Sequence, residues 1–537
     1  MRVDKTVAQS LEHWADARPD HRFLIIADSS RSYGEVRSEA WRIAGALAAR
    51  GVGLGDRVAV MAPTSVQTVT TLLAVAGLGA ITVPLNIYLK GDALRHQLTS
   101  SGCRALVTDA AGLGMVRQLV SSLPDLQFVV VVDGEAPDTD IAGRQLIDYL
   151  ALASEAAPIV PVNGRDEDTY AILYTSGTTG LPKGCVISNG QTKHWARYTE
   201  ALSALTDDDV VFTAAPLFHV GGQTPLLGAL AVGIPVVIES GFSASRYLAR
   251  ATEVGATVAV AVGWIAQALL KQPPSDCDKS HTLRAMSTVQ LSVAEQEQFA
   301  ERFGIRTLTQ QYGQTECYPI AYNPFAEQAV SPYTGRPAPA LHVAIHDDAG
   351  RSVAPGVVGE IVVRPREPHA MFERYWGDDA ATVKAFDGLW FHTGDLGREV
   401  DGELQYVDRK KDSMRRRGEN VSAFELERTL ARFENVTGAA VIGVEIEGEL
   451  DQSIKAVLVV TNPDTFDLGA LAAYMAHELP YFAVPQYIEI VPELPRNASG
   501  RVMKDQLRAV GVNDATRDLI AMGLGVTREQ RRASTTA

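Results

Sequence analysis

The sequence predicts an α/β protein with a small separate domain at its C-terminal end, and two observations carry this prediction. First, short runs rich in β-branched residues alternate with segments of small and apolar residues that are typical of helices. Second, the composition changes beyond Leu404, where a cluster of charged residues precedes a new αβ pattern. Such alternation predicts parallel sheets covered by helices.

Each predicted strand follows from its own apolar run. The runs cover residues 57–61, 105–107, 128–132, 210–213, 235–238 and 257–260. Residues 68–89 are uncharged over a length that raises the question of a membrane span, but Gly77, Gly79 and Pro84 interrupt them. We therefore predict a buried helix followed by a buried strand here, and no membrane span.

Length, charge and cysteine usage bound the class of protein. A chain of 537 residues is long enough for several cores. Its net charge of −15 disfavours a nucleic-acid partner, because phosphate binding needs a basic surface. The four cysteines do not have the spacing of metal ligands, so we expect them to be free and mostly buried thiols. The charged N-terminal segment has no apolar signal region, so we expect a cytoplasmic protein.

The strongest chemical signal is a run of glycines and hydroxyl residues before a lysine. Glycines allow a close backbone approach, hydroxyl groups donate to phosphate oxygens, and the lysine adds a positive charge. The pattern does not fit the Walker loop, which requires Gly-Lys-Ser/Thr. The candidate phosphate-binding residues are Thr175, Ser176, Gly177, Thr178, Thr179, Gly180 and Lys183.

Four further motifs follow in order along the chain. They read PLFHVGG over residues 216–222, QYGQTE over 311–316, WFHTGD over 390–395 and DRKKD over 408–412. With the phosphate loop they resemble the adenylate-forming superfamily, which contains acyl-CoA synthetases, peptide-synthetase adenylation domains and beetle luciferases. The resemblance covers nearly the whole chain.

The resemblance implies a fold and an activity. The fold is a large N-terminal domain of two sheet–helix sub-domains and a small β-barrel over residues 1–410, then a mobile α/β lid over 411–510. Residues 511–537 are expected to be a flexible tail. The activity is that of an acyl-CoA ligase, which forms an acyl-adenylate (acyl-AMP) from a carboxylic acid and ATP, and then a coenzyme A thioester. The implied cofactors are ATP or acyl-AMP and AMP, coenzyme A and Mg²⁺.

The resemblance also implies roles for single residues. His219 would gate the path between the carboxylate and the thiol, Lys411 would be the hinge of the lid, and Gly418 would leave room for pantetheine. Thr178 and Glu316 would hold Mg²⁺, which prefers oxygen ligands. Asp395 would accept hydrogen bonds from the ribose, with help from Arg409. The remaining nucleotide-binding candidates are Gln311, Tyr312, Gly313 and Thr315.

Two positions depart from the family pattern. Arg501 follows Gly500 where the family has the C-terminal lysine that bridges the substrate carboxylate and the α-phosphate. Arginine keeps the charge but is bulkier and planar, so adenylation is expected to be weakened or lost while thioester formation persists. Lys504 is a candidate replacement. The second departure is the bulkier run at residues 287–292, where the family has a glycine-rich wall for adenine.

The acyl substrate is predicted only as a class. Small and apolar residues near the expected pocket indicate a sizeable hydrophobic acid rather than acetate. The adenylate would come from a separate enzyme if adenylation is lost, and a homodimer is the default assembly. The candidate pocket residues are His219, Val220, Gly222, Val262, Gly263 and Trp264.

Several alternatives stay open at this point. A conventional two-step synthetase would tolerate Arg501, and a non-catalytic protein would bind the acyl group or nucleotide without turnover. An amino-acid-activating module is disfavoured, because residues 218–222 contain no aspartate to bind an α-ammonium group. A luciferase-like oxygenase is testable by light emission.

Overall fold

The structure is a computed structural model, and it describes residues 4–133, 140–175, 181–261, 263–289, 291–410, 412–416, 419–446, 452–479, 483–496 and 502–525. The chain forms two compact units that interleave in sequence. The first unit is Met1–Ala344, Val362–Phe391 and Val400–Gln405, and the second is Ile345–Ile361, His392–Glu399 and Tyr406–Ala537.

An eight-stranded sheet forms one half of the first unit. Its order is β10-β9-β4-β3-β5-β6-β8-β7, and all neighbours are parallel except β9 with β10 and β7 with β8. The strands are β3 Arg57–Met61, β4 Ile81–Pro84, β5 Ala105–Thr108, β6 Phe128–Val131, β7 Asp140–Ile141, β8 Arg144–Asp148, β9 Thr169–Thr175 and β10 Lys183–Ser188.

A seven-stranded sheet forms the other half. Its order is β15-β14-β13-β11-β12-β1-β2, and only β2 runs antiparallel to its neighbour. The strands are β1 Arg22–Ile26, β2 Ser29–Ser32, β11 Val211–Thr213, β12 Val236–Ile238, β13 Val258–Val260, β14 Ala285–Ser287 and β15 Arg306–Leu308.

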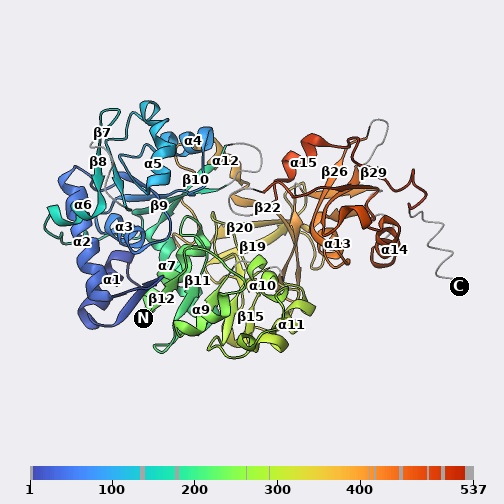
Figure 1. Ribbon diagram of the computed structural model, residues 1–537, viewed down its shortest axis with the longest axis horizontal. Coiled ribbons are helices and arrows are strands. Elements are labelled where there is room, and N and C mark those ends of the chain that lie inside the picture. Colours follow the sequence, from blue (N-terminus) through green and yellow to red (C-terminus); the bar gives the residue numbers. More distant parts are fainter. Residues whose placement is uncertain are drawn as a thin grey trace. The chain divides into compact units, whose positions relative to one another are not determined.

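Helices cover both faces of these two sheets (Figure 1). Helices α2, α3, α7 and α8 pack between the sheets, α4 and α5 cover the outer face of the larger sheet, and α9 to α11 cover that of the smaller. The helices of this unit are α1 Val7–Ala17, α2 Tyr33–Ala49, α3 Val66–Gly77, α4 Gly91–Ser101, α5 Ala110–Arg117, α6 Tyr149–Glu155, α7 Asn189–Ser203, α8 Val220–Val232, α9 Tyr247–Glu253, α10 Gly263–Leu270, α11 Val293–Phe303 and α12 Asp379–Ala385.

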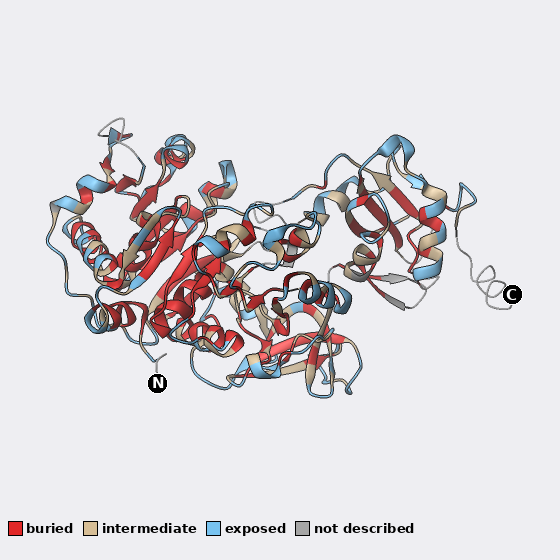
Figure 2. Cartoon of the chain, turned by 60° about the horizontal axis from the view of Figure 1, so that its bottom comes forward, coloured by how far each residue is buried: buried red, intermediate tan, exposed pale blue. Residues whose placement is uncertain are grey.

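The central strands are buried on both faces, as the red strands in Figure 2 show. Continuous apolar runs are expected of parallel strands that carry helices on both sides. All six strands predicted from such runs are present, with ends that agree to within one residue. The uncharged segment at residues 68–89 contains most of α3 and the buried strand β4, as predicted.

Local side chains fix several helix starts. Thr6 and Gln9 form a capping box at α1, and Ser32 and Glu35 form the same arrangement at α2. Each box satisfies backbone N–H groups that have no partner within the helix. Among the described helices, none is long and apolar enough to cross a membrane.

Smaller sheets lie where the sequence predicted a barrel. A three-stranded sheet has the order β16-β17-β18, and a five-stranded sheet has the order β19-β20-β22-β21 with β23 beside β22. The chain passes from one compact unit to the other within β19, β20, β22 and β23. The strands are β16 Gln311–Tyr312, β17 Ala321–Tyr322, β18 Arg336–Pro337, β19 Leu341–His346, β20 Gly359–Pro365, β21 Phe386–Asp387, β22 Trp390–Val400 and β23 Glu403–Arg409.

The C-terminal part of the second unit is a small α/β domain around its own core. It has a hairpin, a four-stranded sheet of order β26-β27-β28-β29, and three α-helices among its described residues. The elements are β24 Ser413–Arg416, β25 Glu419–Ser422, α13 Ala423–Leu430, β26 Val436–Val444, β27 Ser453–Val460, α14 Leu468–Glu478, β28 Tyr487–Ile490, α15 Lys504–Val510 and β29 Arg517–Asp518.

The folded chain extends past the boundary at residue 510 that the sequence suggested. Strand β29 pairs with β28, and Leu519 after it is 1% exposed. The expectation of a flexible tail from residue 511 onward is therefore wrong for this stretch, because an apolar residue beyond the polar turn enters the core. The boundaries at residues 410 and 411 stay predictions.

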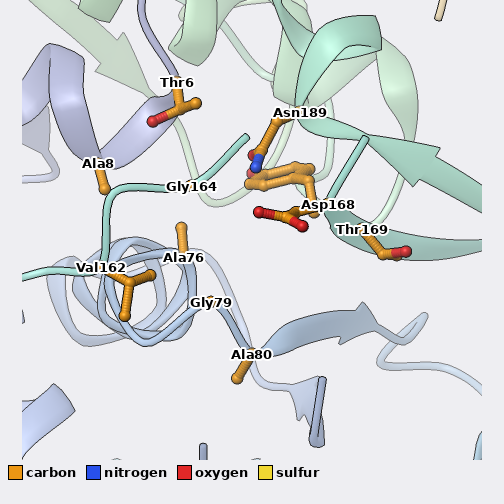
Figure 3. Close-up of a pocket in the computed structure, with 11 residues that line it drawn as sticks. Thr6, Ala8, Ala76, Gly79, Ala80, Val162, Gly164, Asp168, Thr169 and Asn189 are labelled. Carbon is orange, nitrogen blue, oxygen red and sulfur yellow. The ribbon is translucent and has the colours of Figure 1, made fainter. Parts of the chain in front are cut away.

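A small pocket lies where the N-terminal segment meets the end of α3 and the start of β9 (Figure 3). Thr6, Val162 and Asn189 line it together with mostly small residues. Its one carboxylate, that of Asp168, already accepts the backbone N–H of Arg165 at 2.7 Å. None of the predicted site residues lines this pocket, so it is a feature of packing rather than part of the predicted site.

Candidate functional site

The phosphate-loop motif is placed by a β-hairpin. Strand β9 ends at Thr175 and β10 begins at Lys183, and these two residues face each other in the antiparallel register. The loop between them carries Ser176, Gly177, Thr178, Thr179 and Gly180, which lie outside the described residues. The hairpin therefore brings the two described ends of the motif to one edge of the larger sheet.

Lys183 and Glu316 both contact Tyr375. The Lys183 Nζ lies 4.8 Å from the centre of the Tyr375 ring, and the Tyr375 hydroxyl donates a hydrogen bond to Oε1 of Glu316 at 3.0 Å. The backbone places Tyr375, because residues 372–376 run antiparallel along β10 and the Phe372 N–H donates to the Glu316 carbonyl at 2.7 Å. Two residues from distant motifs are thus brought together by a tyrosine that the sequence analysis did not single out.

Burial determines the protonation states of Tyr375 and Cys185 beside Glu316. Burial, reinforced by the negative charge of Glu316, raises the pKa of the Tyr375 hydroxyl, so Tyr375 stays a donor to the carboxylate. Burial also raises the pKa of the Cys185 thiol, which lies beside Glu316 and Thr175. A carboxylate and a lysine around a neutral phenol form a donor set suited to Mg²⁺ and phosphate together.

Hydrogen bonds to other protein groups hold both ends of the Gln311 side-chain amide. Its amide nitrogen donates to the Ser287 hydroxyl at 2.7 Å and to the carbonyls of Thr288 and Leu308, and its amide oxygen accepts from Tyr198. Gln311 thus ties together α7 and the ends of β14 and β15. Ser287 is the first residue of the bulkier run, and its hydroxyl accepts a hydrogen bond from Gln311. This part of the run therefore helps to hold Gln311 in place.

The next residues of this motif form a compact turn. The Tyr312 carbonyl accepts the N–H of Ile320 at 2.8 Å, and its hydroxyl accepts from the Gln314 amide. A side chain at Gly313 would come within 2.5 Å of the Tyr318 ring, so glycine is required there. Thr315 is half-buried in the same turn. The turn fixes the position of Glu316 directly after it.

His219 caps the helix that follows the second motif. It is the residue before α8, and its carbonyl accepts the N–H groups of Gly222 and Gln223 at 3.0 and 3.1 Å. Its Nε2 is buried and has no hydrogen-bond partner within the described chain. Burial lowers the pKa of His219, so the imidazole is neutral at neutral pH.

The first turn of α8 shows what its small residues do. A Cβ at Gly222 would lie 2.2 Å from the Pro216 carbonyl oxygen, so this glycine permits close backbone packing. Val220 is half-buried at the first helical position. Val262 lies outside the described residues, while Gly263 and Trp264 form the start of α10.

In the second unit, Asp395 lies within strand β22, where the backbone makes a local turn at Gly394, whose φ is +68°. It is 5% exposed, its N–H donates to the Thr393 hydroxyl at 3.1 Å, and the Arg409 Nε lies 3.8 Å from its Oδ1. The structure therefore brings together Asp395 and Arg409, the two residues predicted to bind ribose.

Glu360 supports this turn from the neighbouring strand. Its carboxylate accepts the Gly394 N–H at 3.1 Å and contacts His392 Nδ1 at 3.1 Å and Lys410 Nζ at 3.0 Å. Burial opposes ionisation, but the bonds from His392 and Lys410 outweigh it and lower the pKa of Glu360. The Lys410 N–H in turn donates to the Gly394 carbonyl at 2.8 Å. One buried carboxylate thus holds both sides of the Asp395 turn.

Comparisons with known proteins decide the family. Residues 11–376 match the AMP-binding enzyme family, and residues 425–501 match the AMP-binding enzyme C-terminal domain. The chain belongs to the AMP-binding enzyme family. Its resemblance to the adenylate-forming superfamily is thereby confirmed.

Relatives of this AMP-binding enzyme agree on the class of reaction. It is 32% identical over 483 residues to the crotonobetaine/carnitine–CoA ligase of Salmonella heidelberg (strain SL476), covering 89% of this chain and 93% of the relative. It is 27% identical to o-succinylbenzoate CoA synthetase from Bacillus subtilis in complex with its acyl-adenylate, with a TM-score of 0.81, covering 93% of this chain and 97% of that one. The AMP-binding enzyme is thus an acyl-CoA ligase that acts through acyl-AMP.

The same synthetase has also been solved with ATP and a magnesium ion. That structure is 26% identical to this AMP-binding enzyme and has a TM-score of 0.80. The match covers 93% of this chain and 98% of that chain. Binding of ATP or AMP, of Mg²⁺ and of coenzyme A therefore belongs to this family in general. The mixed α/β fold, with a large N-terminal and a smaller C-terminal domain, is confirmed.

Three further predicted residues of this AMP-binding enzyme are not placed. Lys411, Gly418 and Arg501 lie outside the described residues. Lys504, the candidate substitute for Arg501, is described, and its Nζ lies 2.8 Å from Oε1 of Glu427.

Sequence reasoning missed Tyr375 and Glu360, which hold predicted residues in place. Tyr375 stands in the run MFERYW over residues 371–376, and Glu360 follows a glycine at the start of a strand. Neither pattern indicates chemistry by itself, since their partners lie 59 and 50 residues away in the chain.

Proposed function

We propose that this acyl-CoA ligase is specialised for the second half-reaction, in which coenzyme A and an acyl-adenylate give acyl-CoA and AMP. The thiol sulfur attacks the acyl carbon, the bond from that carbon to the AMP oxygen breaks, and the thiol proton is released. Adenylation of the free acid by ATP is weakened or lost, and a separate adenylating enzyme supplies the adenylate.

Arg501 is the observation that carries the proposal. It occupies the position where the family places a lysine between two anions, and a planar guanidinium does not reproduce a compact ammonium there. Loss of one preorganised electrostatic group typically lowers a rate by about 10²–10³. Retention of Glu316, Asp395 and Arg409 supports continued recognition of an adenylate.

The candidate site residues have the following proposed roles. Lys183 and the hydroxyl groups of its loop bind phosphate, Glu316 with Thr178 holds Mg²⁺, and Asp395 with Arg409 binds ribose. Neutral His219 gates the approach of the thiol, and a neutral ring adds no charge that would attract the adenylate phosphate. Lys411 is the proposed hinge of a mobile lid, and Gly418 the proposed contact with pantetheine.

The proposed acyl group is a sizeable hydrophobic one, either an aromatic or polycyclic acid of secondary metabolism or a fatty acid. Support comes from Val220 at the start of α8 and from the relative named for o-succinylbenzoate, an aromatic acid. Gly222 does not enlarge the pocket, because backbone atoms fill the space beside it. Crotonobetaine, named for the other relative, belongs in any substrate panel.

The test measures the two half-reactions separately with a panel of acids and their synthetic adenylates. ATP–pyrophosphate exchange reports adenylation, and consumption of coenzyme A from adenylate reports thioester formation. The variants are Arg501→Lys and, as a matched control, Arg517→Lys, which makes the same change at an exposed position of β29.

The proposal predicts that Arg501→Lys raises exchange by about 10²-fold and leaves thioester formation within about threefold of wild type. The control should change neither rate. If wild type already exchanges as fast as Arg501→Lys, the protein is a conventional two-step synthetase and the proposal is wrong.

A further inference from the structure

Lys504 begins α15 and is paired with an acid inside the C-terminal domain. Its Nζ lies 2.8 Å from Oε1 of Glu427, and the side chains are 13% and 21% exposed. The same Glu427 oxygen accepts the N–H of Val441 at 2.7 Å. Lys504 thus connects α15 to α13 and to strand β26.

A second acid, Asp408, lies at the start of α13, the helix that carries Glu427. Asp408 is 2% exposed and accepts the N–H groups of Arg409 at 2.7 Å and Phe424 at 3.3 Å. Burial raises the pKa of Asp408, and the positive charge of Lys504 opposes that rise. Burial likewise raises the pKa of Glu427, again opposed by Lys504. The positive charge of Lys504 therefore favours the ionised form of two carboxylates, that of buried Asp408 and that of partly buried Glu427.

Arg508, one helical turn further along α15, contacts another acid of the same segment. Its Nη2 lies 2.5 Å from Oδ1 of Asp412, which is 5% exposed. Residues i and i+4 lie on one face of a helix, so Lys504 and Arg508 present two cations side by side. Asp408 and Asp412, their partners, flank position 411 in the sequence.

The far end of α15 is anchored too. The Nζ of Lys455, which is 1% exposed, donates to the Gly511 carbonyl at 2.5 Å, and Lys455 also pairs with Glu489. A helix of seven residues has little stability of its own. These charged contacts therefore fix its position in the domain.

We infer that Lys504, through its ion pair with Glu427, and Arg508, through its ion pair with Asp412, form a cationic clamp that fixes α15 to α13 and to the segment that carries Asp408 and Asp412, so that Lys504 is a positioning residue and not a substitute for the missing lysine at 501. The inference deepens the proposed function, and it rests on the premise of that function that adenylation needs a lysine. Moving Lys504 away would remove the ion-pair partner of partly buried Glu427 and the positive charge that favours ionisation of buried Asp408, and breaking such a pair is unfavourable.

The experiment compares Lys504→Met, Lys504→Arg, Glu427→Gln and the double variant Lys504→Met/Glu427→Gln. Thioester formation from synthetic adenylate is measured in the full chain, and exchange is measured with each change added to Arg501→Lys. Asp505→Asn is the matched control, because it removes a 61% exposed carboxylate that lies 2.8 Å from Nη1 of Arg508 on the same helix. The contact of Arg508 with Asp412, which is made through Nη2, should remain.

A clamp predicts that Lys504→Met slows both half-reactions by about tenfold or more, since misplacement by about 1 Å is costly. Lys504→Arg should recover most of this loss. Glu427→Gln should partly rescue Lys504→Met, because it removes one of the two uncompensated charges. The defect of Lys504→Met should also shrink as pH falls, because protonation of Asp408 and Glu427 removes the same charges.

Different results would overturn the inference. If Lys504→Met abolishes exchange but leaves thioester formation intact, Lys504 acts directly in adenylation. If it behaves like Asp505→Asn, or if the Glu427 change gives no rescue, there is no clamp. Should Lys504→Met fail to fold, Lys504→Arg and the double variant still decide. The effect of Arg501→Lys alone tests the proposed function, so the two failures are distinguishable.

Discussion

Two lysines show how differently this protein uses the same side chain. The Lys183 Nζ lies over the Tyr375 ring at the end of a hairpin, while the Lys504 Nζ lies against Glu427 and offsets the charge of Asp408 as well. The first contact is weak and leaves the ammonium group able to bind an anion. The second is a partly buried ion pair whose loss exposes other charges to an apolar environment.

The comparison shows that a lysine close to Arg501 in sequence is not for that reason able to replace the lysine that is absent at position 501. Lys504 is three residues from Arg501, yet its contacts assign it to the structure of the C-terminal domain. Lys183 is far from Glu316 in sequence, yet both contact Tyr375. The partners of a charged group, rather than its distance along the chain, indicate whether it is available to a substrate.

The largest expected effect is that of Lys183→Met on adenylation. In the Arg501→Lys background, exchange should fall by about 10²–10³ because a charge on the phosphates is lost. Thermal unfolding should change little, because a cation–π contact is worth about 0.5–1 kcal/mol at exposed sites. For Lys183→Met, a large loss of thermal stability with unchanged exchange would mean that Lys183 has a structural role and does not bind phosphate.

Tyr375→Phe keeps the ring but removes the donor to Glu316, and it should lower the exchange rate about tenfold.

Glu360→Gln should give an intermediate effect, because this carboxylate both supports the structure and holds the Asp395 turn. We expect the KM for adenylate to rise about tenfold, as for loss of hydrogen bonds to a charged group, with a smaller change in kcat. Asp348→Asn is the matched control. Asp348 also contacts Lys410, at 3.1 Å, but its side chain is 93% exposed, and exposed pairs contribute little. Equal effects of the two changes would contradict a special role for Glu360.

The smallest expected effect concerns His219. Burial lowers its pKa below the ordinary value of 6.5, so it stays neutral above that pH. The ratio of thioester-formation rates for wild type and His219→Asn should therefore be constant from about pH 6.5 to about pH 8. The neutral state contributes stability above the unfolded pKa, and this contribution is lost as pH falls through the folded pKa. A break in the rate ratio near neutral pH would show that His219 titrates there.

Much of the fold was predictable from the sequence, because parallel strands buried on both faces are encoded as short apolar runs. The β29 strand was not, since Arg517 and Asp518 are polar and only Leu519 beyond them enters the core. Pairing with β28 decides that strand, and pairing between distant segments has no local signal.

The candidate site was predictable to the extent that its residues stand in motifs. Lys183, Glu316, Asp395 and Arg409 could be named from sequence, and the structure brings them together in pairs. Tyr375 and Glu360 could not be named, because their importance arises from contacts with residues distant in the chain. The small residue Gly222 was assigned to a pocket, whereas the Pro216 carbonyl accounts for it.

The most direct test of this account is ATP–pyrophosphate exchange by wild type and Arg501→Lys, with thioester formation from synthetic adenylate measured on the same preparations. The account predicts weak exchange in wild type, a rise of about 10²-fold in Arg501→Lys, and similar thioester formation in both. Fast exchange by wild type that Arg501→Lys does not improve would contradict it.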